Sequence, residues 1–79
     1  MAALPEYGEV THRRPFSKVL RMVRQKKCLS QEQLALEAGM DRTTIGRLER
    51  GEREPALETV FILAKALRIK ASEIVALME

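Results

Sequence analysis

Polar side chains that can hydrogen-bond to nucleic-acid bases recur at helical spacing in residues 41–50. Arginine can donate two parallel hydrogen bonds to guanine, and threonine can contact the methyl group of thymine. We therefore predict base contacts by Arg42, Thr43 and Arg47. Gly46 joins this set because a missing side chain would let the helix lie close to the bases, although simple tolerance of glycine explains it equally well. For the two arginines, the alternative is plain solvation on an exposed helix face.

Two short helices joined by a tight turn are predicted to position these side chains. Ser30 and Gln33 have the spacing of a capping box, so the first helix is expected to run from Gln31 to about Ala38. Gly39 follows directly and can adopt the left-handed backbone that ends a helix. A turn at this glycine would redirect the chain at a steep angle.

The second helix is predicted to run from Arg42 to about Arg50, with Asp41 as its N-cap and Gly51 at its end. Ala35 on the first helix is small enough for the second helix to pack closely against it. Three apolar residues would fill the angle between the helices: Met40, Ile45 and Leu48. This combination favours a DNA-binding helix-turn-helix over a generic helical hairpin.

The rest of the chain has the period of amphipathic helices, and nothing in it alternates like a strand. Pro15 is placed in the first turn of a helix with the apolar stripe Phe16, Val19, Leu20 and Val23. After Pro55, a second stripe consists of Leu57, Val60, Phe61, Ala64 and Leu67. The last helix spans about 71–78 and presents Ile74, Val75, Leu77 and Met78. The predicted class is all-α, with residues 15–79 as one helix-turn-helix domain and residues 1–14 as a flexible arm.

Length and composition limit what else the chain can be. Its 79 residues suffice for one small core. Its net charge is +3, and residues 1–30 carry +5 of charge against −2 in residues 31–55, which is compatible with a nucleic-acid partner for the basic first part. The start lacks the features of a secretion signal and no apolar run is long enough to span a bilayer, so a cytoplasmic protein is expected. His12 and Cys28 are a lone histidine and a lone cysteine, so we expect no metal site. Neither a cofactor motif nor a catalytic arrangement is present, and we do not expect an enzyme.

Four stretches resemble the Cro and phage-repressor helix-turn-helix family, also called the xenobiotic-response-element family. They are residues 29–35, 38–40, 45–51 and 55–59, and the resemblance covers about residues 16–78. It implies a compact five-helix lambda-repressor-like domain that binds double-stranded operator DNA, usually as a homodimer on a palindrome. Chains of this length in the family include phage repressors, controllers of restriction-modification genes and antitoxins.

The resemblance also suggests roles for polar residues beyond the base-contacting set. Gln31 would face the DNA backbone at the N-terminus of its helix, where amide groups can hold a phosphate. Thr44 and Arg53, the latter in the loop after the second helix, are further candidates for phosphate contacts. Arg24 and Glu49 would form a structural ion pair, whose loss would resemble a folding defect rather than a lost DNA contact.

Three positions depart from the family pattern. Members commonly have glycine where this chain has Cys28, and a side chain there would be strained if the backbone is left-handed. Members often have serine where this chain has Ala56 and Lys70, so the last two helices are expected to lack a side-chain cap.

The partners of the domain are less closely defined by the sequence. Four apolar residues near the C-terminus would form a dimer surface or simply complete the core: Ile69, Ile74, Leu77 and Met78. Arg13 and Arg14 would enter the minor groove or follow phosphates, unless they are merely part of a flexible arm. The alternatives to a repressor or controller are an antitoxin that also binds a toxin, and an accessory module that binds protein instead of DNA.

Overall fold

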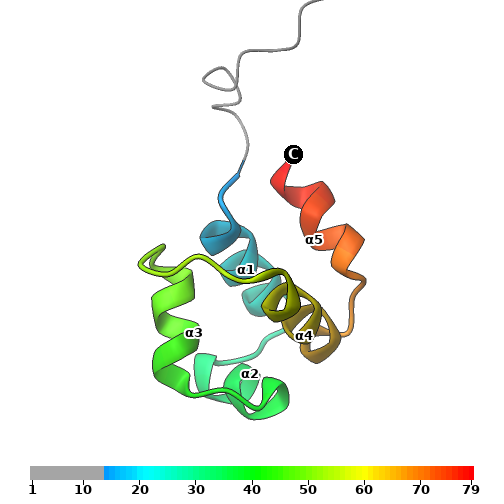
Figure 1. Cartoon of the computed structure of the whole chain (residues 1–79). Coiled ribbons are helices and arrows are strands. Elements are labelled where there is room, and N and C mark those ends of the chain that lie inside the picture. The colour runs from blue at the N-terminus through cyan, green and yellow to red at the C-terminus, as the bar shows by residue number, and fades with distance from the viewer. Residues whose placement is uncertain (1–13) are drawn as a thin grey trace, which may run out of the picture.

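Five helices follow one another in the computed structural model, which describes residues 14–79 (Figure 1). They are α1 (Phe16–Lys26), α2 (Gln31–Ala38), α3 (Arg42–Glu49), α4 (Leu57–Leu67) and α5 (Ala71–Met78). No strand occurs in this part of the chain, which confirms the predicted all-α class. No helix in it is both long and apolar enough to cross a membrane. The predicted arm, residues 1–14, lies outside the described residues except for Arg14.

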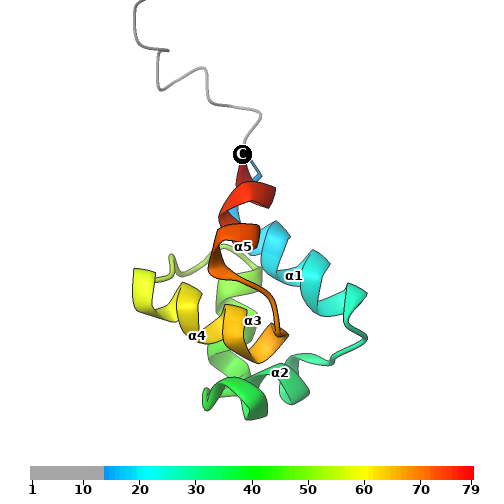
Figure 2. The same cartoon turned by 90° about the vertical axis from the view of Figure 1, so that its right-hand side faces the viewer.

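All five helices contribute to a single apolar core. The predicted α1 stripe is buried, and the other helices add Leu34, Ala35, Ile45, Leu48, Val60, Leu63, Ala64, Leu67 and Ile74. α1 packs against α3 and α5, α2 packs against α3 and α4, and α4 also packs against α5 (Figure 2). Because α3 contacts both α1 and α2, its orientation is fixed from two directions.

The buried face of α4 differs from the predicted stripe. Leu57 and Phe61 are 71% and 57% exposed, whereas Leu63, which the stripe omitted, is completely buried. α4 has apolar residues on more than one side, so periodicity alone could not identify the side that faces the core. The prediction for Leu57 and Phe61 was therefore wrong, and these two side chains lie on the surface.

The helix ends mostly follow the local signals in the sequence. Ser30 Oγ accepts a hydrogen bond from the Gln33 N–H at 3.0 Å, and Gln33 Oε1 accepts one from the Ser30 N–H at 2.8 Å. Gly39 has a φ of 67°, as a left-handed helix end requires. Asp41 occupies the N-cap position of α3, as predicted, although its side chain makes no capping hydrogen bond. Pro15 is the N-cap of α1 rather than a residue of its first turn.

The last two helices lack a side-chain cap at their N-terminal residue, as expected. Ala56 has no side chain that can accept a hydrogen bond from α4. At the start of α5, the carboxylate of Glu73 accepts a hydrogen bond from the Lys70 N–H at 2.9 Å, while the ammonium group of Lys70 has no lone pair with which to accept one. α5 therefore has only one half of a capping box.

Cys28 is strained at the end of α1. The Leu29 N–H donates to the Arg24 carbonyl at 3.1 Å, and the Cys28 N–H donates to the Gln25 carbonyl at 2.9 Å. These two bonds form a Schellman motif, which requires a left-handed residue at the position of Cys28. Its φ is 60°, a conformation in which a side chain is unfavourable. The strain suggested by comparison with the family is therefore present.

Cys28→Gly should stabilise the protein by about 0.5–1 kcal/mol, because relief of left-handed strain exceeds the entropy that glycine adds to the unfolded chain. For a domain of this size, the midpoint of thermal unfolding should rise by about 3–6 °C. Cys28→Ala is the matched control, since it removes the thiol but keeps the β-carbon and should leave the midpoint nearly unchanged. An equal rise in both variants would show that the thiol, not the backbone, is unfavourable.

Candidate nucleic-acid interface

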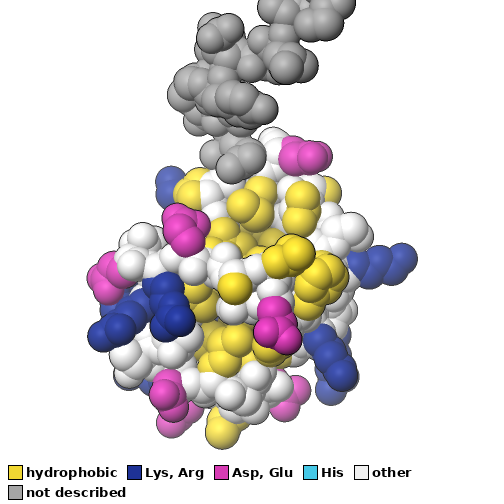
Figure 3. Space-filling model, viewed as in Figure 1, with side chains coloured by type: hydrophobic (Ala, Val, Ile, Leu, Met, Phe, Trp, Pro, Cys, Tyr) yellow, Lys and Arg dark blue, Asp and Glu magenta, His cyan; other side chains and the backbone are white. Residues whose placement is uncertain are grey.

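α3 is fixed on one face and open on the other. Ile45 and Leu48 are 0% and 1% exposed, so they hold the inner face in the core. The side chains of Arg42, Thr43 and Arg47 are exposed. α3 lies at one edge of the bundle in Figure 1, and the same view in Figure 3 shows basic side chains gathered on that side. The structure thus places three of the predicted base-contacting residues on the accessible part of one helix.

Arg24 and Glu49 form an ion pair that connects α1 with α3. Arg24 Nε and Nη2 donate to the two Glu49 carboxylate oxygens at 2.6 and 2.9 Å, and Arg24 Nη1 donates to the Leu29 carbonyl at 2.8 Å. The Glu49 side chain is 0% exposed and that of Arg24 is 11% exposed. Arg21 Nε approaches Glu49 at 3.7 Å, but its side chain is 57% exposed. The pair therefore fixes α3 against α1 from inside the domain.

The charged form of Glu49 is favoured despite its burial. Burial alone would raise the pKa of this carboxyl, but hydrogen bonds from Arg24 and Gln31 outweigh burial and hold its pKa below the ordinary value. The hydrogen bond to Glu49 likewise raises the pKa of Arg24. Both groups remain charged at neutral pH, as a structural ion pair requires.

Gln31 has an internal partner that the sequence did not indicate. Its Nε2 donates to Glu49 Oε1 at 3.0 Å, so the side chain connects the start of α2 to the ion pair. This amide group is therefore partly occupied within the domain. In the first turn of α2 the Gln33 N–H donates to Ser30 Oγ, which leaves the N–H groups of Gln31 and Glu32 as the backbone donors available to a phosphate.

Gly46 is buried, so its backbone is not open to close approach by DNA bases. A β-carbon at this position would lie 3.0 Å from Nη1 of Arg50 and 3.8 Å from Oε1 of Gln31. The space that glycine leaves is thus occupied by the protein's own guanidinium group, and the predicted base contact at Gly46 does not fit this arrangement. Arg50 was not among the predicted site residues. Its position four residues after Gly46 could have indicated that its side chain lies over this glycine, because residues four apart share a helix face.

Thr44 and Arg53, the two remaining phosphate candidates, lie beside one hollow. It has a volume of about 300 Å³, and its lining also includes Met40, Pro55 and Thr59. Thr44 is half-buried and Arg53 is exposed. The structure therefore brings these two residues, nine positions apart in sequence, to the same side of α3.

Apolar side chains are exposed on the outer face of α4 and α5. Leu57, Phe61 and Val75, of which Val75 is 47% exposed, line a hollow of about 430 Å³ there. Figure 3 shows apolar side chains gathered over these two helices. Ile74, which was predicted for a dimer surface, is completely buried in the core. Of the two roles considered for Ile74, completion of the core is therefore the one that the structure supports.

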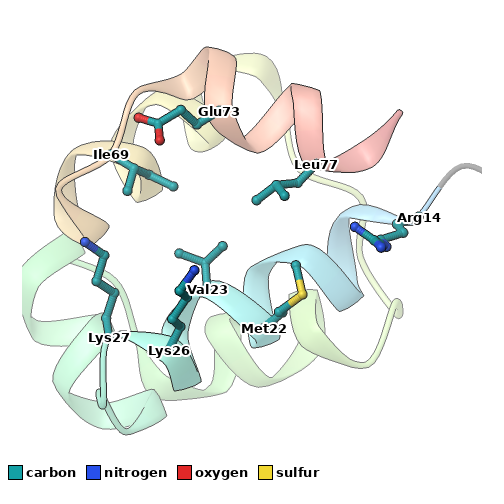
Figure 4. A pocket seen from close by; sticks show the side chains of 8 residues that line it. All are labelled: Arg14, Met22, Val23, Lys26, Lys27, Ile69, Glu73 and Leu77. Atoms are coloured by element: carbon teal, nitrogen blue, oxygen red, sulfur yellow. The ribbon is translucent and has the colours of Figure 1, made fainter.

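A further hollow of about 540 Å³ lies between α1 and α5 (Figure 4). Ile69 and Leu77 line it together with Met22 and Val23, and charged side chains surround these apolar residues: Arg14, Lys26, Lys27 and Glu73. Ile69, Leu77 and Met78, the other dimer candidates, are half-buried and pack against the core. No group of three metal-ligating side chains occurs in residues 14–79.

Comparison with protein families and sequences identifies similar regulators. Residues 20–74 match the family model described as helix-turn-helix. Control protein C.SmaI of Serratia marcescens is 54% identical over 48 residues, which cover 61% of this chain and 57% of that protein. The match thus spans little more than half the length of this relative.

Two solved structures share the fold. The restriction-modification controller protein C.AhdI from Aeromonas hydrophila has a TM-score of 0.73 and 40% identity, covering 86% of this chain and 98% of that chain. The DNA-binding domain of the P22 C2 repressor has a TM-score of 0.77 and 26% identity, covering 81% and 84%. The lambda-repressor-like fold is therefore confirmed. These similar proteins are named as regulators, in agreement with the expectation that the chain is not an enzyme.

Proposed function

The chain belongs to the helix-turn-helix family, and we propose that it is a sequence-specific transcriptional regulator that binds a palindromic operator as a homodimer. The observation that carries this proposal is the accessible face of α3, on a helix whose other face is fixed in the core. C.SmaI is named a control protein and C.AhdI a restriction-modification controller protein, which favours a controller over an antitoxin, and the comparisons give no support for a toxin partner. Because the proposed ligand is double-stranded DNA, we propose that the protein acts in the cytoplasm.

α3 is proposed to lie in the major groove. Arg42 and Thr43 are in its first turn, and Arg47 lies about one turn further on the exposed side. These positions are the ones from which a recognition helix contacts base edges. Thr44 and Arg53 are proposed to contact phosphates, together with the start of α2 at Gln31, and thereby fix the orientation of α3 without specifying sequence.

The outer face of α4 and α5 is proposed as the dimer surface. A two-fold axis pairs a surface with itself, so Leu57, Phe61 and Val75 of one protomer would contact the same residues of the other. Exposed apolar clusters of this kind are characteristic of protein interfaces. The recognition helices of such a dimer must lie roughly 34 Å apart to enter successive major grooves.

Selection of bound sites from random DNA, followed by a salt titration, tests the proposed function. The selected sites should contain two inverted half-sites whose centres are separated by about 10 base pairs or a multiple of that distance. The logarithm of the affinity should fall linearly with the logarithm of salt concentration as counterions are released. Absence of DNA binding at low salt, or an affinity that does not change with salt, would contradict the proposal.

Phe61→Asp should convert the dimer to a monomer and weaken operator binding at least about tenfold, because two charges would have to be buried against one another across the two-fold axis. Sedimentation equilibrium measures the first effect and fluorescence anisotropy the second. Leu36→Asp is the matched control for oligomeric state, since Leu36 is 78% exposed on α2 and outside the α4 and α5 face. If neither variant dissociated, the dimer surface would lie elsewhere. If both dissociated, the effect of the added charge would not be specific to the α4 and α5 face.

A further inference from the structure

Arg50 is held over α3 by a carboxylate from the loop that follows the helix. Its Nε and Nη2 donate to the two oxygens of Glu52 at 2.7 and 3.3 Å. Its Nη1 lies above Gly46, 3.0 Å from where a β-carbon would be. The guanidinium group is therefore oriented by Glu52 on one edge and accommodated by a glycine on the other.

Glu52 occupies the edge of the guanidinium that a phosphate would use. Arginine binds carboxylate and phosphate in the same bidentate manner, through two parallel N–H groups. Both side chains of the pair are 54% exposed, so DNA can reach them without unfolding any part of the domain. Arg50 and the proposed base-contacting Arg47 belong to the same helix end, and Arg47 also attracts Glu52. The pair is thus on the side of the domain proposed to face DNA.

We propose that Glu52 is an intramolecular competitor of DNA, which occupies Arg50 in the free protein and is displaced when a backbone phosphate binds the same guanidinium edge. This inference rests on the proposed function, because it requires α3 to approach DNA. It assigns Arg50 as a phosphate-binding residue and Glu52 as the residue that limits its affinity. The hydrogen bond from Arg50 holds the pKa of Glu52 below its ordinary value, so the competitor remains charged at neutral pH.

The proposal predicts that Glu52→Gln strengthens DNA binding. An exposed ion pair is only weakly stabilising, so its removal should raise affinity by no more than about fivefold at moderate salt. Because phosphate contacts carry no sequence information, the same factor should apply to the selected operator and to a duplex of random sequence. Fluorescence anisotropy with both duplexes measures the two affinities.

Glu54→Gln is the matched control for net charge. Glu54 is exposed in the same loop, and no ion pair joins it to another side chain within residues 14–79. If Glu52 competes with DNA, Glu52→Gln should raise DNA affinity more than Glu54→Gln does. The difference should disappear when each of these changes is combined with Arg50→Met. Arg50→Met alone should weaken binding to both duplexes and lower the salt slope by about one.

Each other outcome contradicts the inference in a distinct way. Equal gains for Glu52→Gln and Glu54→Gln, or a difference that persists alongside Arg50→Met, would show that only net charge acts. Weaker binding by Glu52→Gln would show that Glu52 orients Arg50 productively for DNA. If the unmodified protein binds neither duplex, the proposed function is wrong, and the proposal that Glu52 competes with DNA is wrong with it.

Discussion

Arg24→Ala should lower the free energy of unfolding by about 3–5 kcal/mol, because it leaves the buried carboxylate of Glu49 without its main partner. The Glu49 side chain is 0% exposed beneath Arg24, so the change removes two hydrogen bonds from a carboxylate that is shielded from solvent in the intact protein. The loss also removes the contact of Arg24 with the Leu29 carbonyl at the end of α1. Urea denaturation followed by circular dichroism measures the change.

Two companion variants separate the ion pair from general effects of charge. Arg21→Ala removes a cation 3.7 Å from the same carboxylate, but the exposed Arg21 side chain should contribute less than about 1 kcal/mol. Arg24→Met combined with Glu49→Leu removes both charges and should recover much of the lost stability, because an apolar pair needs no compensating partner. If Arg24→Ala retained full stability but lost DNA binding, Arg24 would be a DNA contact and not a structural residue.

The same ion pair makes stability sensitive to acid. The pKa of Glu49 is lower in the folded protein than in the unfolded chain, so protons bind preferentially to the unfolded state. Its contribution to stability is therefore fully present above its unfolded-state pKa of about 4.3, and it is lost as the pH falls through the lower folded-state pKa. Glu49→Gln should flatten this part of the stability profile.

The features predicted correctly from the sequence are those set by local physics. The capping box of Ser30 and Gln33 and the left-handed Gly39 depend on residues within one turn of each other. The apolar residues of α1 other than Met22 all lie on one face, so the orientation of that helix was unambiguous. α4 is apolar on more than one face, and only packing against its neighbours decided that Leu63 is buried and Phe61 exposed.

The features that were missed depend on contacts between elements or on side-chain competition. Gln31 was expected to face a phosphate, but the buried carboxylate of Glu49 on another helix also accepts a hydrogen bond from it. Gly46 was assigned to the bases because its missing side chain would let the helix lie close to them, whereas in the fold Arg50 covers it. In both cases an internal partner satisfies a group whose type and position alone suggested an external ligand.

Arg42→Ala should weaken binding to the selected operator by about 1–3 kcal/mol, or roughly 5- to 150-fold, because the proposed bidentate contact with guanine would be lost. Arg42 is exposed in the first turn of α3, and it has no ion-pair partner in the described part of the chain. The change should therefore leave folding intact and alter recognition alone. Competition between operator and random-sequence duplexes, measured at one salt concentration, gives the specificity ratio.

The specificity ratio distinguishes recognition of a base from general attraction by charge. Lys65→Ala removes the same charge from the exposed side of α4 and should reduce both affinities slightly and equally. Arg42→Lys keeps the charge but lacks the planar fork, so it should restore affinity for random DNA without restoring preference for the operator. If Arg42→Ala weakened both duplexes by the same factor, Arg42 would contact the backbone, and sequence recognition would depend on Thr43 and Arg47 instead.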